Sequence, residues 1–129
     1  MTSRKPRVRA AASSADEPLQ LPASPAAEHP ALSHNEVTIL AETFRLLGDQ
    51  SRLRIVLCCM QGPFSVGDIA ERLDLSQSLV SHHLRLLRGA RLVKGVRHAK
   101  QVFYEIADQH VSQVLQDMTI HVAEDSADE

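Results

Sequence analysis

The sequence predicts a mainly α-helical fold with one small β-hairpin, and three observations lead to this prediction. Apolar residues recur at the i, i+3, i+4 spacing of amphipathic helices in separate segments between residues 34 and 123. One short stretch, 101–106, instead places an apolar residue at every second position, as a strand does. A three-residue turn joins the third helical segment to the fourth, which is the spacing of a helix-turn-helix.

The first 33 residues show no periodic apolar pattern and are rich in alanine, serine and proline. This composition predicts a disordered N-terminal tail. The first nine residues carry four positive charges, which could contact a phosphate backbone or could simply be solvated. We expect one folded domain over residues 34–125 and an acidic C-terminal tail over 126–129.

Two helices are expected at the start of the folded domain. The first begins near His34 and ends at Gly48, and either Asp49 or Ser51 can cap the second. The sequence Gly62-Pro63 stops the second helix. The apolar positions are Val37, Leu40, Ala41, Phe44 and Leu47 in the first helix, and Leu53, Ile55, Val56, Leu57 and Met60 in the second.

A helix-turn-helix is expected next. Ser65 and Asp68 form an S-x-x-D capping box for a short third helix. The turn 74–76 leads to a fourth helix that runs to about Arg88, with Gly89 as its stop signal. Along this helix Val80, Leu84 and Leu87 fall on one face and point inward.

The outward face of the fourth helix has the composition of a DNA-reading surface, because it carries small hydroxyls and basic residues but no acid. Gln77 can pair bidentately with adenine, and Ser81 and His82 can hydrogen-bond to bases. Arg85 and Arg88 lie further along, where phosphates are the expected partners. The alternative is a basic, solvated helix in an all-α protein. The expected DNA contacts of this helix are Gln77, Ser78, Ser81, His82, Arg85 and Arg88.

Two strands follow the fourth helix, over about 92–94 and 101–106, with a polar hairpin tip at 95–100. The tip carries Arg97, His98 and Lys100, an arrangement typical of a wing against DNA. Residues 76–100 hold six Arg and Lys and no acid, although the whole chain has a formal net charge of −2. These features together predict a winged helix-turn-helix with double-stranded DNA as its partner.

Four residues of types that bind metals lie in or beside the last predicted helix, 109–123. His110 and His121 are within it, and Asp108 and Glu124 are at its two ends. His110 and His121 point in nearly the same direction but lie about 16 Å apart along the helix axis, at roughly 1.5 Å per residue. Zinc holds its ligands at about 2 Å, so one copy cannot bring both histidines to one ion. Two antiparallel copies can, which predicts a homodimer with two symmetric sites. Asp117 and Asp125 are weaker carboxylate candidates, and Asp108 also suits the cap of this helix.

Cys58 and Cys59 are the only cysteines, and as sequence neighbours they do not suit a structural disulfide. No apolar run approaches the roughly 20 residues of a membrane span, and no secretory signal follows the basic N-terminus. We therefore expect a cytoplasmic protein without a membrane partner. The expected role of both cysteines is small buried side chains, and the alternative is a thiol-based sensor of oxidant, persulfide or arsenite.

Residues 40–124 resemble the ArsR/SmtB family of bacterial metal-responsive repressors. The matching stretches are LLGDQSRLRIV (46–56), SVGDIAERL (65–73), SQSLVSHHLRLLRGARLV (76–93), VFYEIADQH (102–110) and the H-x-x-E of His121 and Glu124. The resemblance implies a homodimeric winged helix-turn-helix whose first and last helices form the interface. It also implies zinc ligands from both subunits at Asp108, His110, His121 and Glu124, with His121 linked to the backbone near Arg91.

The resemblance further implies a repressor that releases a palindromic operator on binding zinc (Zn2+) and so derepresses zinc efflux or sequestration genes. Some members of the family sense thiophilic metals through cysteines on the helix equivalent to 65–73 and near the N-terminus, and this sequence has no cysteine at either place. Two imidazoles with two carboxylates suit zinc or cobalt (Co2+). Nickel (Ni2+) sensing stays open, because His29 and His34 could add ligands. We expect neither an enzyme nor a protein that binds a small organic ligand.

Overall fold

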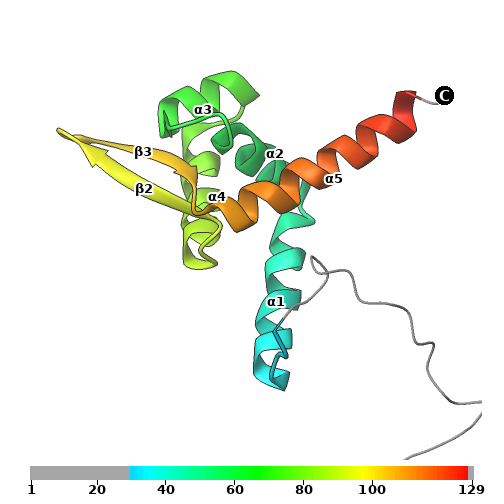
Figure 1. The fold of residues 1–129 in the computed structure, drawn as a ribbon. Helices are drawn as coiled ribbons and strands as arrows, with labels where there is room; N and C mark the ends of the chain where they lie inside the picture. Colours follow the sequence, from blue (N-terminus) through cyan, green and yellow to red (C-terminus); the bar gives the residue numbers. More distant parts are fainter. Residues whose placement is uncertain (1–29, 128–129) are drawn as a thin grey trace, which may run out of the picture. The chain divides into compact units, whose positions relative to one another are not determined.

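Short side-chain caps set the starts of the helices in the computed structural model, which describes residues 30–127. Ser33 and Ser65 each form a capping box, and Asp49 and Ser76 each accept one hydrogen bond from a backbone N–H three residues on. Asp49, not Ser51, is therefore the cap of the second helix. The elements are α1 (His34–Leu47), α2 (Gln50–Cys59), β1 (Phe64–Ser65), α3 (Val66–Leu73), α4 (Gln77–Gly89), β2 (Val93–His98), β3 (Gln101–Ile106) and α5 (Gln109–Ala127) (Figure 1).

The hydrophobic core lies where α2, α3 and α4 pack together and against the base of the sheet. Ile55 and Val56 of α2, Ile69 of α3 and Leu87 of α4 are fully buried there. The predicted inward face of α4 is confirmed, because Val80 and Leu84 are buried with Leu87. The hydrophobic core that supports the helix-turn-helix is therefore formed within the described part of one chain.

The three strands form an antiparallel sheet in the order β1-β3-β2. β1 pairs Phe64 with Tyr104, and β2 pairs with β3 along its whole length up to His98 opposite Gln101. β1 was not predicted, because a strand of two residues shows no periodicity. The elements as a whole confirm a mainly helical fold with a small hairpin.

The position of the hairpin tip was predicted wrongly. The tip was expected at residues 95–100, but the ladder continues to His98, so Ala99 and Lys100 alone make the turn. Ala99 has a φ of 56°, the left-handed conformation that a tight two-residue turn requires. Arg97 and His98 consequently lie on β2, and Lys100 is the only one of the three predicted wing residues in the turn itself.

The last helix is longer than predicted and ends at Ala127 instead of Ala123. In Figure 1, α1 and the far end of α5 extend away from the body that α2, α3 and α4 form. Both helices carry apolar side chains that are between 45% and 58% exposed in one chain. These are Val37, Ile39, Leu40 and Phe44 on α1, and Val114, Met118, Ile120 and Val122 on α5.

Candidate DNA interface and metal ligands

The predicted base-reading residues share one surface of α4. Gln77, Ser78, Ser81, His82 and Arg85 together line one shallow hollow, and Arg88 continues this surface towards the C-terminal end of the helix. Ser81 is half-buried and the others are exposed. The helix presents small polar groups near its N-terminus and guanidinium groups further along, which matches the division between base contacts and phosphate contacts in recognition helices.

Gln77 lies at the meeting point of the two helices of the helix-turn-helix. It is the first residue of α4, directly after the cap Ser76. A Cβ atom built on Gly67, in the first turn of α3, would lie 3.6 Å from the Nε2 atom of Gln77. The amide group therefore rests beside α3. Gly67 was not among the predicted site residues, although a glycine in the first turn of a predicted helix can indicate that another group approaches closely.

His83, the neighbour of His82, is buried on the inner side of α4 and is only 7% exposed. Its Nδ1 atom has no hydrogen-bond partner among the described residues. Loss of hydration lowers the pKa of His83, and the nearby carboxylate of Asp49 offsets part of this effect. The imidazole is thus held neutral inside the protein, which separates its role from that of the exposed His82.

The exposed hairpin carries positive charge beside the recognition helix. Arg97, His98 and Lys100 are all exposed, and the His98 ring meets the Phe103 ring edge-on with centroids 6.0 Å apart. At the base of the hairpin, Lys94 Nζ lies 3.5 Å from a carboxylate oxygen of Glu105. The fold therefore brings the predicted wing residues to one projecting ribbon, in which two come from the strand and one from the turn.

The four candidate metal ligands form two pairs at the two ends of α5. Asp108 caps the helix, because its Oδ1 atom accepts a hydrogen bond of 3.0 Å from the N–H of Val111. The same oxygen lies 3.7 Å from Nδ1 of His110, whose side chain is 89% exposed. His121 and Glu124 are exposed near the other end of the helix. The capping role and a ligand role are compatible, since a carboxylate has a second oxygen.

One chain does not assemble these pairs. Among the described residues, no group of three or more His, Cys, Asp or Glu side chains could hold a metal ion. This agrees with the axial separation of His110 and His121, which is about 16 Å at roughly 1.5 Å per residue. Two imidazoles and two carboxylates are donors that suit zinc or cobalt, and a site that used all four residues would need a second copy to supply half of them.

The cysteines are placed as small core residues. Cys59 is buried in the core, and Cys58 is half-buried beside Arg72. Burial raises the pKa of both thiols, that of Cys59 to about 12. Little thiolate is present near neutral pH, so neither sulfur is an activated nucleophile.

In the part of the chain that the structure describes, no helix has the length and apolar character needed to cross a membrane.

A model of one known protein family matches the helix-turn-helix region of the chain. Residues 49–94 match the family described as "Bacterial regulatory protein, arsR family". This range begins at the cap of α2 and ends at the second residue of β2, so it contains the whole helix-turn-helix.

Three curated relatives are similar over most of the folded part. The "Transcriptional repressor SmtB homolog" of Synechocystis sp. is 38% identical over 93 residues, which are 72% of this chain and 70% of that protein. The regulator NmtR of Mycobacterium tuberculosis is 40% identical over 64% of this chain and 68% of its own length. The "Cadmium resistance transcriptional regulatory protein CadC homolog" of Staphylococcus aureus is 33% identical over 66% and 71%. These relatives regulate transcription, which confirms the prediction that the chain is not an enzyme.

A solved structure supports the fold. The winged helix-turn-helix DNA-binding domain of Mb0332 from Mycobacterium bovis, described as homodimeric, has a TM-score of 0.68 and 21% identity. The alignment covers 78% of this chain and 96% of that one. The predicted winged helix-turn-helix is confirmed.

Proposed function

This chain belongs to the ArsR family of bacterial regulatory proteins, and we propose that it is a homodimeric, metal-sensing repressor of transcription. In this proposal the metal-free dimer binds a palindromic operator and zinc binding between the subunits releases it, so that genes for zinc efflux or sequestration are expressed. The observation that carries the proposal is the division of four ligand-type residues into two exposed pairs on one helix.

Dimerisation is supported by the apolar surfaces of α1 and α5. A stripe of Val37, Leu40 and Phe44 on α1, and Val114, Met118 and Val122 on α5, is exposed in one chain. Exposed apolar surface of this extent marks an interaction site. A two-fold axis between antiparallel α5 helices buries this surface and also brings the two ligand pairs together.

The metal ligands would be Asp108 and His110 from one subunit and His121 and Glu124 of the partner subunit, twice in each dimer. Bound zinc would supply a tetrahedral link between the start of one α5 and the end of the other. Asp108 is already oriented by its capping hydrogen bond to Val111, which reduces the freedom that this ligand loses on binding. The relative from Staphylococcus aureus is described as a cadmium resistance regulatory protein, and this description supports a metal as the signal.

The DNA-binding surfaces are the exposed face of α4 and the hairpin. The Gln77 end of α4 would enter the major groove, with Arg85 and Arg88 on phosphates and Lys100 on the adjoining backbone. A two-fold symmetric dimer presents two such surfaces, which requires two half-sites of opposite orientation in the operator.

Metal and DNA use different faces, so the coupling between them must act through two arrangements of the dimer with different stabilities. A coupling free energy of about 3 kcal/mol would weaken DNA binding roughly 150-fold. A thiol-based sensor is the competing function, and the raised pKa of both cysteines disfavours it.

The proposal is tested by fluorescence anisotropy of the full chain on its own upstream promoter fragment, with the protein first treated with a chelator and then titrated with zinc. We expect DNA release that is complete at one zinc per subunit and is lost in His110→Ala. Gln116→Ala changes another exposed residue of α5, away from both ligand pairs, and should respond like the original protein.

Two results would overturn the proposal. DNA binding that is indifferent to zinc, cobalt and nickel would remove the metal signal. DNA release that requires Cys58 and Cys59, shown by its loss in the double serine variant, would establish the thiol sensor instead.

A further inference from the structure

A hollow of about 730 Å³ lies between the inner side of α1, the start of α2 and the C-terminal end of α4. Apolar Ile39, Leu46 and Leu86 form part of its lining. Its charged lining residues are three arginines, Arg45, Arg52 and Arg91, and one carboxylate, Glu42. The hollow therefore has a net positive charge, and neither the metal site nor the DNA-binding surface uses it.

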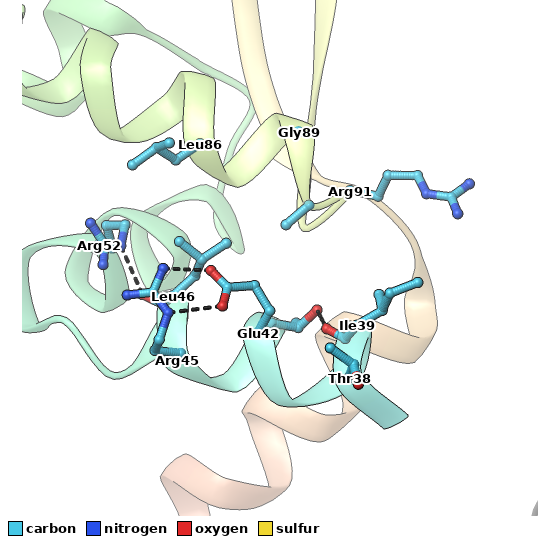
Figure 2. Close-up of a pocket in the computed structure, with 11 residues that line it drawn as sticks. Thr38, Ile39, Glu42, Arg45, Leu46, Arg52, Leu86, Gly89 and Arg91 are labelled. Carbon is cyan, nitrogen blue, oxygen red and sulfur yellow. Dashed lines mark hydrogen bonds and ion pairs between the residues drawn. The ribbon is translucent and has the colours of Figure 1, made fainter. Parts of the chain in front are cut away.

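Two of the arginines are held in place (Figure 2). Arg45 forms an ion pair with Glu42 through two of its nitrogen atoms. Arg52 donates a hydrogen bond of 2.8 Å from Nε to the carbonyl oxygen of Leu46. Both guanidinium groups keep further N–H donors, since each has five.

Arg91 lies at the other end of the hollow, where the recognition helix passes into the hairpin. Figure 2 shows its exposed side chain extended away from Glu42 and Arg45. Its backbone φ of 61° is left-handed, and its N–H is bonded to the carbonyl oxygen of Arg88. The next residue, Leu92, accepts a hydrogen bond of 3.1 Å from the N–H of Ala107, just before α5. This hydrogen bond connects the edge of the hollow near Arg91 to the residues just before α5.

The C-terminal end of the same chain carries the opposite charge. The sequence from 124 to 129 contains four acids in six residues, and α5 continues as a helix to Ala127. In the antiparallel arrangement that places His110 beside His121 of the partner subunit, Gln109 faces position 122 of the partner. Asp125 of the partner subunit then extends about 4.5 Å beyond the start of α5, at roughly 1.5 Å per residue. That is the region of Ala107, Leu92 and Arg91.

We propose that the acidic C-terminal segment of the partner subunit, residues 125–129, docks on the arginine-lined hollow between α1 and the C-terminal end of α4. The occupant is a second copy of this chain, because charge complementarity and continuity with the α5 interface both point to it. The contact would lie at the junction between α4 and β2, so it would link pairing of the subunits to the position of the DNA-binding surface. This inference rests on the antiparallel dimer of the proposed function.

Charge reversal tests the docking in metal-free protein without DNA. The dimer dissociation constant is measured at low ionic strength by sedimentation with fluorescence detection, for Asp125→Lys, for Arg91→Glu and for both changes together. Each single change should raise the constant about five- to tenfold, since each dimer contains two such exposed contacts. The double variant should recover most of the original value, because the reversed charges attract again.

A matched control is Glu71→Lys, which makes the same charge change on an exposed residue of α3. Combined with Arg91→Glu, it should give no recovery. Equal recovery with Glu71→Lys and Asp125→Lys, or additive losses in the Arg91 and Asp125 pair, would overturn the docking.

The result is distinguishable from failure of the proposed function. The zinc titration of the unchanged protein on DNA reports whether metal releases the operator, whatever the charge-reversal variants do. Recovery in the double variant together with zinc-indifferent DNA binding would keep the docked segment and remove the zinc sensor. Metal-dependent release without recovery would keep the sensor and remove the docking.

Discussion

The 13-residue helix α4 buries four side chains, Val80, His83, Leu84 and Leu87, whereas the 19-residue helix α5 buries only Leu115 among its described side chains. The first region has its packing partners within the same chain, in α2, α3 and the sheet. The second packs on the sheet near Val111 and Leu115, but most of its apolar side chains are exposed among the described residues. The described part of one chain therefore buries the inner face of α4 but leaves the apolar surface of α5 exposed, and in the proposed dimer this difference separates DNA binding from metal sensing.

The largest expected effect comes from matched truncations in the two regions. Ile55→Ala, at a fully buried position of α2, should lower the free energy of unfolding by about 2–5 kcal/mol through lost packing and a residual cavity. Phe44→Ala, on the exposed stripe of α1, should leave the fold of one chain intact and weaken the dimer. Urea unfolding at several protein concentrations measures both.

The two variants differ in how their effects depend on concentration. The loss of unfolding free energy in Ile55→Ala should be nearly the same at every protein concentration. The loss in Phe44→Ala should become larger as the protein concentration falls towards the dimer dissociation constant. A loss for Phe44→Ala that is independent of concentration would show that α1 is part of the folding core.

A smaller effect distinguishes two contacts within the DNA-reading region. Gln77→Ala should reduce the preference for operator over random DNA by about 1–3 kcal/mol, because a paired base edge loses its partner. Lys100→Ala should weaken binding to all DNA and lower the salt slope by about one. Anisotropy titrations on operator and random DNA at several salt concentrations measure both. Equal effects of both substitutions on the two DNAs would contradict the assignment.

The smallest expected effect concerns the buried imidazole of α4. The pKa of His83 is lower in the folded protein than its ordinary value of 6.5, because burial disfavours the charged form. The unfolded chain therefore binds this proton first, and the free energy of unfolding should fall as the pH drops below about 6.5. His83→Leu should make this fall smaller in metal-free protein. The free energy of unfolding is measured by chemical unfolding from about pH 7.5 to about pH 5.5.

His83→Gln is a second variant for that experiment, since it keeps a polar side chain at the same buried position but cannot take up the proton. It should reduce the pH dependence as His83→Leu does. An unchanged pH dependence in His83→Leu would mean that the buried ring does not contribute.

Much of the helical fold could be predicted because its signals are local. The capping box at Ser65, the stop at Gly48 and the inward face of α4 all act within one or two turns of helix. The sheet was less predictable. Gly95, Arg97 and His98 show no alternation, since β2 is exposed beyond its first residue, and the pairing with β3 alone makes them a strand.

The candidate site divides in the same way. Residues on one face of one helix, such as Gln77, Ser81 and Arg85, could be placed together from their spacing. The arginines of the hollow could not, because Arg45, Arg52 and Arg91 come from three segments that only the tertiary fold brings to one surface. The metal ligands are predicted by type and spacing, and their assembly from two chains stays a prediction.

The exposed stripes of α1 and α5 also bear on the lifetime of the protein in a cell. A newly synthesised subunit displays this apolar surface until it meets another, and such surface is what chaperones and proteases act upon. Unpaired subunits would be cleared faster than pairs. The abundance of the protein would then be set by degradation of the surplus as well as by synthesis.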